Sequence, residues 1–229
     1  MILIFDLDDT LYDEKTFYLS GLKNVSKYLA KEFNLNYKKN FSELKKTFLK
    51  NGRKNLLENF LKQNKIYNLI NLNTIIKIYR YHNFKIHLYN DAKRFLEHFK
   101  DFNMYIITDG NKMVQNSKIK KLNLNRYFKK IFITNRYGIN SAKPSLKCFS
   151  IIKKKENVKW SSLVYIGDNP NKDFVNLNKK GSLTIRVLRG MYKNKKVSKL
   201  YDAKYKYKGY SSALINFLKK YDNHEKKKN

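Results

Sequence analysis

Two aspartates close to the start of the chain, Asp6 and Asp8, lie at the end of the apolar run Ile2 to Phe5. Side chains two residues apart in an extended chain lie on the same face, so the two carboxylates would be close together. Like charges at that distance are costly unless a cation accompanies them. Mg²⁺ commonly accepts one or two carboxylates together with waters and a phosphate oxygen. The pair therefore indicates a magnesium site that could meet a phosphate ester.

Polar residues follow two further apolar runs in the same way. The run 104–107 is followed by Thr108, Asp109, Gly110 and Asn111, and the run 163–166 by Gly167, Asp168 and, further on, Asp173. Lys143, followed by Pro144, lies in the stretch between them. In an open parallel sheet the active groups gather beyond the carboxyl ends of the strands. We therefore expect all these residues at the same edge as Asp6 and Asp8.

This set of residue types can supply each part of a phosphoryl transfer. Such a reaction needs an in-line nucleophile, neutralisation of the phosphoryl oxygens and a proton for the leaving alcohol. Asp6 can attack and form an aspartyl phosphate, and Asp8 can exchange protons with the leaving oxygen and the attacking water. Thr108 and backbone donors near Asp109 and Gly110 can bind phosphoryl oxygens. Lys143 can offset the charge of nucleophile and phosphate.

The elements that would carry these residues alternate along the chain. Strands are predicted at residues 1–7, 104–107, 130–133, 163–166, 183–187 and 203–207, with helices between them. This alternation predicts an α/β fold with a parallel sheet and helices on both of its faces. Residues 17–88 instead repeat their apolar positions at helical spacing and predict a separate helical block.

Four segments at these positions resemble the four motifs of the haloacid dehalogenase-like (HAD) hydrolase superfamily. They are DLDDT at 6–10, TDG at 108–110, KP at 143–144 and GDNPNKD at 167–173. They occur in the family's order and extend over nearly the whole chain. The resemblance implies a Rossmann-like core, a phosphate-ester hydrolase activity and Mg²⁺ as the cofactor.

The resemblance also implies a role for each matching residue. Asp6 is expected as nucleophile and Asp8 as acid/base, with Thr108 and Lys143 completing the catalytic set. The substrate-binding set is expected to be Thr108, Asp109, Gly110, Asn111 and Lys143. Mg²⁺ would be held by the Asp6 side chain, the Asp8 backbone carbonyl and Asp168. Asp173 belongs to the same acidic motif and would act through water or through Lys143.

Two features narrow the expectation within the superfamily. An acid at position 8 resembles the phosphatases and phosphomutases, because members that dehalogenate, cleave phosphonates or pump ions generally lack it. The first two motifs are 102 residues apart (108 minus 6), whereas the second and third are 35 apart (143 minus 108). An insertion in the first gap resembles the family's helical C1 cap, a lid over small substrates. We therefore expect core segments at 1–14 and 90–223, a cap at 15–89 and a disordered basic tail at 224–229.

The formal net charge of +32 is the strongest feature of the composition. A field that positive favours anionic partners, nucleic acid among them. The lysines are spread along the whole chain, however, and no zinc-finger spacing or RNP-type aromatic motif accompanies them. We therefore attribute the charge to compositional drift and expect no nucleic-acid partner.

The chain carries no stretch of about 18 apolar residues, so we expect no membrane span. The first residues lack the basic leader of an export signal, and the single cysteine, Cys148, excludes an internal disulfide. These features favour a cytoplasmic protein, either a monomer or a homodimer.

The sequence thus predicts a Mg²⁺-dependent phosphatase for a small phosphorylated metabolite, with a sugar or sugar-acid phosphate favoured. Two alternatives use the same residues: a phosphomutase of the superfamily, and a phosphatase directed at nucleotides or nucleic acid. Arg136 and Arg189 lie near the expected active edge, where each is equally compatible with gripping a substrate anion and with no specific role.

Overall fold

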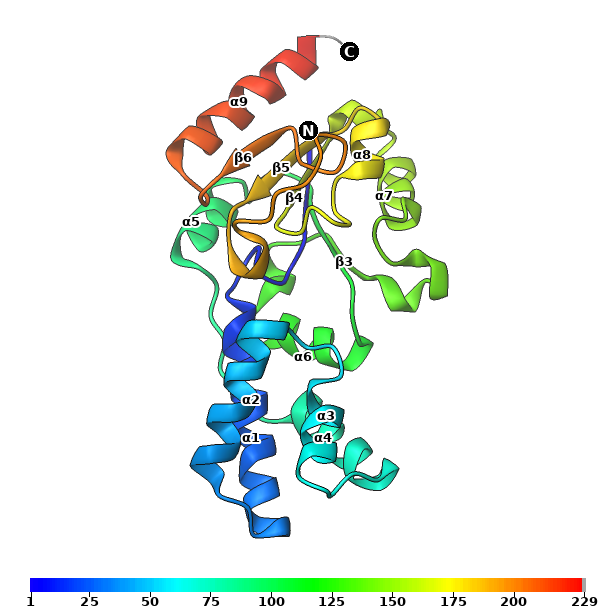
Figure 1. Ribbon diagram of the computed structural model, residues 1–229. Helices are drawn as coiled ribbons and strands as arrows, with labels where there is room; N and C mark the ends of the chain where they lie inside the picture. Colours follow the sequence, from blue (N-terminus) through cyan, green and yellow to red (C-terminus); the bar gives the residue numbers. More distant parts are fainter. Residues whose placement is uncertain (228–229) are drawn as a thin grey trace. The chain divides into compact units, whose positions relative to one another are not determined.

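The first apolar run of the chain forms a central strand of a six-stranded sheet in the computed structural model, which describes residues 1–227 (Figure 1). The strands are β1 (Ile2–Phe5), β2 (Met104–Thr108), β3 (Lys130–Ile133), β4 (Leu163–Gly167), β5 (Leu183–Val187) and β6 (Tyr205–Tyr207). Their order is β3-β2-β1-β4-β5-β6, and every neighbouring pair is parallel. The carboxyl ends of β1, β2 and β4 therefore meet at one edge.

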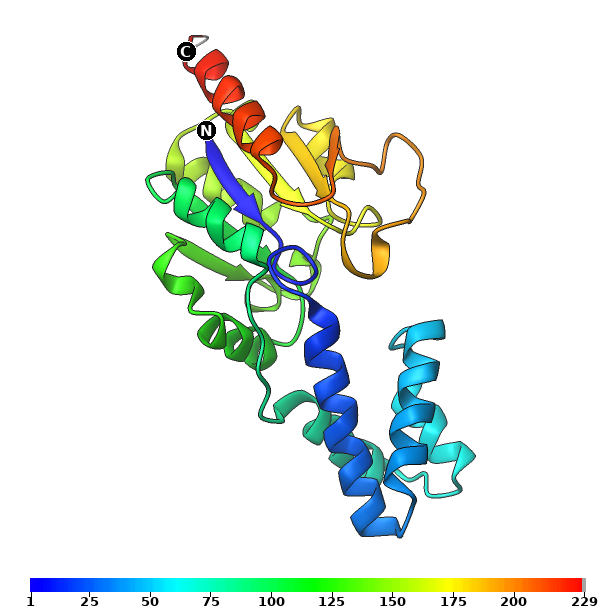
Figure 2. The ribbon, with the colours of Figure 1, turned by 90° about the vertical axis from the view of Figure 1, so that its left-hand side faces the viewer.

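Helices cover both faces of this sheet, as predicted (Figure 2). On one face α7 (Lys147–Glu156) and α8 (Val175–Lys179) contribute apolar side chains to the core around β1, β2 and β4. On the other, the Phe5 ring lies 6.0 Å from that of Phe95 on α5 (Asn90–His98) and 5.7 Å from that of Phe128. Strands buried on both faces need apolar side chains at every position, which explains the unbroken runs of β1 and β2.

The helical block is a separate compact unit, Lys15–Lys85. It contains α2 (Tyr37–Asn51), α3 (Leu56–Gln63), α4 (Leu69–Tyr81) and all but the first residue of α1 (Glu14–Phe33). The Tyr18 and Tyr79 rings stack at 6.5 Å. A Cβ at Gly21 would come within 2.7 Å of the Tyr79 ring, so glycine lets α1 and α4 approach closely.

The unit ends four residues before the boundary that we expected at residue 89. Residues 86–89 group with the sheet, because the backbone N–H of Tyr89 donates to the Leu11 carbonyl and Tyr12 forms an antiparallel bridge with Leu88. The two connections to the helical unit therefore run side by side where they leave the sheet domain.

The last helix, α9 (Ser212–Lys227), is longer than predicted. Residues 224–227, expected in a disordered tail, are helical, and residues 228–229 lie outside the described part of the chain. The N-terminal ammonium lies 2.9 Å from the Asp222 carboxylate, which fixes the last turns, and the following Glu and Lys residues are good helix formers. Among residues 1–227, no helix combines the length and apolar character that crossing a bilayer requires.

Truncating Ile4 in the sheet core tests the packing. Ile4 is fully buried on β1, and Ile4→Ala removes methyl groups that no neighbour can replace, so we expect a loss of about 2–5 kcal/mol in the free energy of unfolding. The same change at Ile139, which is 98% exposed, should cost less than about 0.5 kcal/mol. Urea denaturation measures both. Equal losses would contradict the assignment of this core.

Candidate active site

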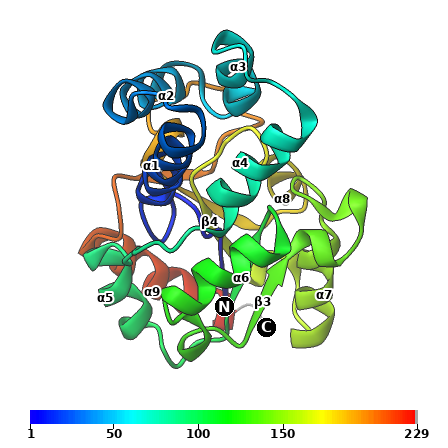
Figure 3. The ribbon, with the colours of Figure 1, turned by 90° about the horizontal axis from the view of Figure 1, so that it is seen from below.

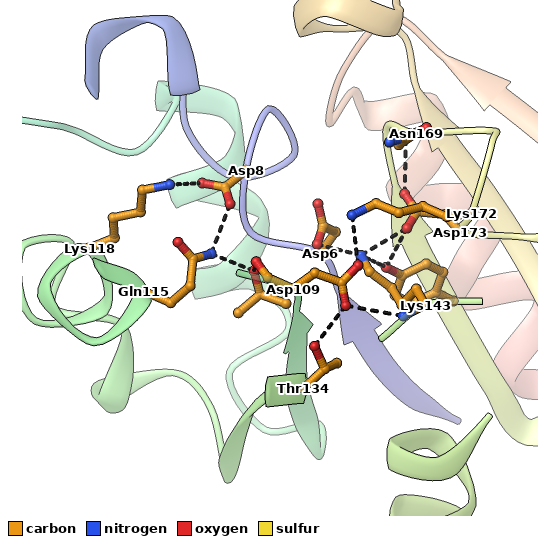
Figure 4. Close-up of polar contacts among 12 residues, drawn as sticks. Asp6, Asp8, Asp109, Gln115, Lys118, Thr134, Lys143, Asn169, Lys172 and Asp173 are labelled. Atoms are coloured by element: carbon orange, nitrogen blue, oxygen red, sulfur yellow. Dashed lines mark hydrogen bonds and ion pairs between the residues drawn. The ribbon is translucent and has the colours of Figure 1, made fainter. Parts of the chain in front are cut away.

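The centre of the site is an ion pair between the ends of distant segments. Asp6 directly follows β1, and its backbone N–H donates to Ile166 of β4. The Lys143 ammonium lies 2.6 Å from Asp6 Oδ1 and 2.8 Å from Asp173 Oδ1 (Figure 4). Burial alone would lower the pKa of Lys143, but Asp173 and Asp6 raise it well above its usual value. The lysine is therefore a permanent cation between two carboxylates.

Three buried carboxylates, those of Asp6, Asp168 and Asp173, each place an oxygen within 4.8 Å of the other two. Burial raises the pKa of Asp6 to about 7, with Lys143 opposing and Asp173 adding to the rise. Burial, followed by the charges of Asp173 and Asp6, raises the pKa of Asp168 well above its usual range. When all three carboxylates of this triad are ionised, they and the Lys143 ammonium together carry two net negative charges. A hard divalent cation with oxygen ligands fits this donor set.

Asp173 is held by protein donors on both of its oxygens. Besides Lys143, the Tyr165 hydroxyl donates to Oδ1 at 3.2 Å and the Asn169 backbone N–H donates to Oδ2 at 2.9 Å. A Cβ at Gly167 would come within 2.5 Å of Oδ2, so a glycine is needed for this approach. These contacts favour Asp173 as the residue that orients Lys143, with Asp168 as the more available ligand.

The segment after β2 forms the second half of the site. Thr108 is fully buried, and Gly110 has a φ of +130°, a conformation that L side chains rarely adopt. The Asn111 side chain accepts hydrogen bonds from the backbone N–H groups of Met113 and Val114 and so caps α6 (Lys112–Lys121). The expected phosphate-binding loop therefore leads straight into a capped helix.

The side chain of Asp109 ties neighbouring loops together. Its Oδ1 accepts from the Thr134 hydroxyl at 2.8 Å and from the Lys143 backbone N–H at 3.1 Å, and its Oδ2 accepts from Lys172 at 2.7 Å (Figure 4). Burial would raise the pKa of Asp109, but Lys143 and Lys172 hold it below its usual value. Asp109 therefore fixes Lys143, and the substrate contact expected near it would come from backbone groups.

Asp8 points away from Asp6 in the close-up (Figure 4). Its Oδ1 accepts from Lys118 and from the Tyr12 hydroxyl, both at 2.6 Å, and its Oδ2 accepts from Gln115 at 2.8 Å. Burial opposes ionisation of Asp8, but Lys118, Tyr12 and Gln115 lower its pKa below the ordinary value. The side chain expected as acid/base is thus part of a separate polar cluster.

Sequence reasoning missed Gln115, Lys118, Tyr165 and Lys172. Lys172 stands inside the fourth motif segment, where its position next to Asp173 was a signal that could have been used. Gln115 and Lys118 are three residues apart, a spacing that places them on one face of the helix after Asn111. Arg189, considered for a substrate anion, pairs with Asp91 and stacks at 4.1 Å over the Tyr89 ring.

Comparison with known proteins decides the family. Residues 3–187 match the model of the haloacid dehalogenase-like hydrolases. This chain is a HAD-family hydrolase. The HAD resemblance and the hydrolase assignment are confirmed. A curated relative, the glyceraldehyde 3-phosphate phosphatase of Methanocaldococcus jannaschii, is 27% identical over 216 residues that cover 84% of this chain and 86% of the relative. The Methanopyrus kandleri protein of the same name is 30% identical over 41% of this chain and 39% of its own.

Solved structures show the same HAD fold. A subfamily IA HAD hydrolase of Geobacter sulfurreducens superposes with a TM-score of 0.70 at 12% identity, covering 95% of both chains. A HAD hydrolase of Bacillus subtilis, solved bound to magnesium, gives a TM-score of 0.69 at 20% identity, covering 95% of this chain and 97% of its own. At these identities the likeness concerns the fold alone.

Removing one carboxylate of the triad tests the cation site without any assay of activity. Mg²⁺ at about 100 times its dissociation constant should stabilise the wild type by about 2.7 kcal/mol and raise its thermal midpoint. Asp168→Asn should abolish this gain, whereas Asp101→Asn, at an exposed aspartate just before β2, should retain it. Thermal unfolding with and without Mg²⁺ measures the shift. A full Mg²⁺ response in Asp168→Asn would exclude Asp168 as a ligand.

The raised pKa values of these carboxyl groups also predict an unusual pH dependence in EDTA. Between about pH 5 and 7 the folded protein binds more protons than the unfolded chain at Asp6, with its pKa of about 7, at Asp9, with its pKa of about 6, and at Asp168, whose pKa is raised. Stability is therefore greatest at the low end of this window and falls by up to about 1.4 kcal/mol per pH unit for each such proton.

Urea titrations at several pH values measure this slope. Asp168→Asn should flatten it, and saturating Mg²⁺ should reduce or reverse it, because the cation binds the ionised carboxylates. Groups with lowered pKa, such as Asp109, raise stability only until their unfolded forms are ionised, near pH 5, so they do not mask the effect above that pH. A stability that rises from about pH 5 to 7 in EDTA would contradict the repulsion described for the triad.

Proposed function

We propose that this hydrolase is a Mg²⁺-dependent phosphatase that cleaves a small phosphomonoester through a phosphorylated Asp6. The observation that supports it most directly is the cluster at the sheet edge, where one buried lysine holds Asp6 among carboxylates. Such a cluster has an excess of negative charge that a divalent cation would offset, and the oxygens of a phosphate ester would complete the coordination of that cation.

The residues present fit Mg²⁺, and we assign Asp6 and Asp168 as its side-chain ligands, with the Asp8 backbone carbonyl as a further ligand. Bound there, Mg²⁺ would neutralise the carboxylates and polarise a phosphoryl oxygen of the substrate. Lys143 adds a second positive charge at the same nucleophile, 2.6 Å from Asp6 Oδ1. It leaves the other oxygen of Asp6 outside that contact.

In the first step a carboxylate oxygen of Asp6 attacks phosphorus and the bond to the leaving oxygen breaks. The leaving oxygen takes its proton from Asp8, whose hydrogen-bond donors favour the ionised form, so Asp8 must take up a proton before this step. Thr108 and the backbone N–H groups that follow it hold the phosphoryl oxygens during transfer. Lys143 keeps Asp6 in place, because its ammonium is itself fixed by Asp173 and by Tyr165, whose hydroxyl accepts from it at 2.9 Å.

In the second step water attacks the phosphorylated Asp6 and gives a proton to Asp8. The bond between Asp6 and phosphorus breaks, and inorganic phosphate leaves with the carboxylate restored. The same group thus works as acid and then as base, which requires it to be near the leaving oxygen in both steps. Asp8 follows Asp6 by two residues in the chain and is the acidic side chain that we assign to this task.

We propose a phosphorylated sugar or sugar acid as the substrate class. Three curated relatives carry the name glyceraldehyde 3-phosphate phosphatase, and the one from Methanocaldococcus jannaschii aligns over most of both chains. A three-carbon aldehyde phosphate is therefore the first substrate to test. We further propose that the enzyme works in the cytoplasm as a monomer or homodimer.

A screen of phosphorylated metabolites with Mg²⁺ tests this proposal. We expect phosphate release to be fastest from glyceraldehyde 3-phosphate or another small sugar or sugar-acid phosphate, and slower from nucleotides. Asp6→Asn should lower kcat at least about 10³-fold, because it removes the nucleophile, while Asp101→Asn should retain wild-type activity.

Three results would contradict the proposal: no phosphate from any ester, full activity in Asp6→Asn, or activity unaffected by EDTA. Formation of an isomeric sugar phosphate in place of inorganic phosphate would identify a phosphomutase. A preference for nucleotides, or for nucleic-acid ends with a steep loss of affinity in salt, would identify the remaining alternative.

A further inference from the structure

A cluster of buried side chains surrounds Asp8 and has no part in the steps above. Gln115 and Lys118 lie on the face of α6 that points toward Asp8, and both are almost completely buried. Their polar groups converge on the two carboxylate oxygens of Asp8 (Figure 4). Buried side chains of the sheet domain thus hold the Asp8 carboxylate in a fixed position.

Lys118 is the charged part of this cluster. Its ammonium lies 2.6 Å from Asp8 Oδ1 and 3.0 Å from Glu14 Oε1, and 5.7 Å from the centre of the Tyr12 ring. A buried ammonium is stable only where anions and acceptors surround it, so its place is fixed by these partners. Through the shorter of the two ion pairs, Lys118 fixes the first oxygen of Asp8.

Gln115 links Asp8 to the expected phosphate-binding residue. Its amide nitrogen donates to Asp8 Oδ2 at 2.8 Å and to Thr108 Oγ1 at 2.7 Å. One carboxamide therefore sets the separation between the acid/base and Thr108. A Cβ at Gly110 would come within 3.4 Å of Gln115 Cγ and Cδ, so the glycine also leaves room for this side chain.

The direction in which Asp8 is held agrees with the geometry of the reaction. In-line transfer places the leaving oxygen, and later the attacking water, on the side of phosphorus opposite to Asp6. A group that serves those oxygens must lie near the bound phosphoryl group but not against Asp6. The cluster turns Asp8 away from Asp6 (Figure 4) and links it to Thr108 through the Gln115 amide.

We propose that Lys118 and Gln115 are positioning residues for Asp8, which hold its carboxylate on the side of the leaving oxygen and the attacking water. The inference rests on the proposed function, and it assigns a task in that reaction to two residues outside the four motif segments. Neither side chain is required to touch the substrate. Their effect on catalysis is exerted through Asp8.

The chromogenic ester p-nitrophenyl phosphate separates the two steps. The bond between phosphorus and the p-nitrophenyl oxygen breaks as Asp6 attacks, and p-nitrophenolate leaves as a stable anion. Phosphorylation of Asp6 by this ester therefore needs no proton from Asp8. Attack by water still transfers a proton to Asp8 as the bond between Asp6 and phosphorus breaks. A defect in the position of Asp8 should therefore slow the second step alone.

Rapid-quench measurements of p-nitrophenol release and protein-bound phosphate test this expectation. In Lys118→Met and Gln115→Met we expect decay of the phosphorylated enzyme to slow at least about tenfold, with its formation at the wild-type rate. Asp8→Asn should show the same pattern more strongly. Lys118→Arg, which keeps the cation, should recover part of the decay rate. Lys120→Met, at an exposed lysine of the same helix, should match the wild type.

Formation and decay that slow by the same factor, or decay at the wild-type rate, would overturn the positioning role. Gln115→Met removes no charge and keeps the test decisive if Lys118→Met does not fold, which its thermal midpoint will show. A wild type that never forms phosphorylated enzyme or releases phosphate would overturn the proposed function and this inference with it. An active wild type with unaffected variants would overturn this inference alone.

Discussion

Repulsion among buried carboxylates is the constraint on which the active edge of this protein depends. Three parallel strands end in acidic or polar segments, and the sheet topology brings Asp6, Asp168 and Asp173 within a few ångströms of one another. Lys143 compensates part of this charge, and the proposed divalent cation would balance the rest. The remaining polar contacts of the site serve mainly to keep that lysine and those carboxylates in fixed places.

The lysines that compensate the carboxylate charges belong to two separate clusters. Lys143 pairs with Asp6, the proposed nucleophile, whereas Lys118 pairs with Asp8, the proposed acid/base. Asp109 pairs with a third lysine, Lys172, and stays ionised. Aspartates two residues apart in the sequence therefore experience opposite surroundings, with the pKa raised at Asp6 and lowered at Asp8. In the proposed reaction Asp6 therefore needs the charge of a cation to stay ionised, whereas Asp8 is already in the form that accepts a proton from water.

The sheet could be predicted well because a strand buried on both faces has a clear sequence pattern, which is a continuous apolar run followed by polar residues. β1, β2 and β4 are of this kind, and their order of pairing brings together the motif residues that the sequence singled out. No comparable sequence pattern marks Lys118 and Gln115. Their partner Asp8 lies 110 and 107 residues away, and a buried lysine in a lysine-rich helix looks like an exposed one. The length of α9 was missed because charged helix formers also suit a tail.

The two connections to the helical unit affect how related sequences can diverge. They run side by side at Leu11, Tyr12, Leu88 and Tyr89. Backbone contacts within the sheet domain hold together the two points at which the chain enters and leaves the helical unit. For the sheet domain, the helical unit is therefore equivalent to a long loop whose ends are fixed. The entropy of closing a loop depends only weakly on its length. Helices can therefore be lengthened, lost or exchanged in that unit with little effect on the register of the strands. The helical unit can diversify in this way while the sheet edge that carries the candidate site stays unchanged.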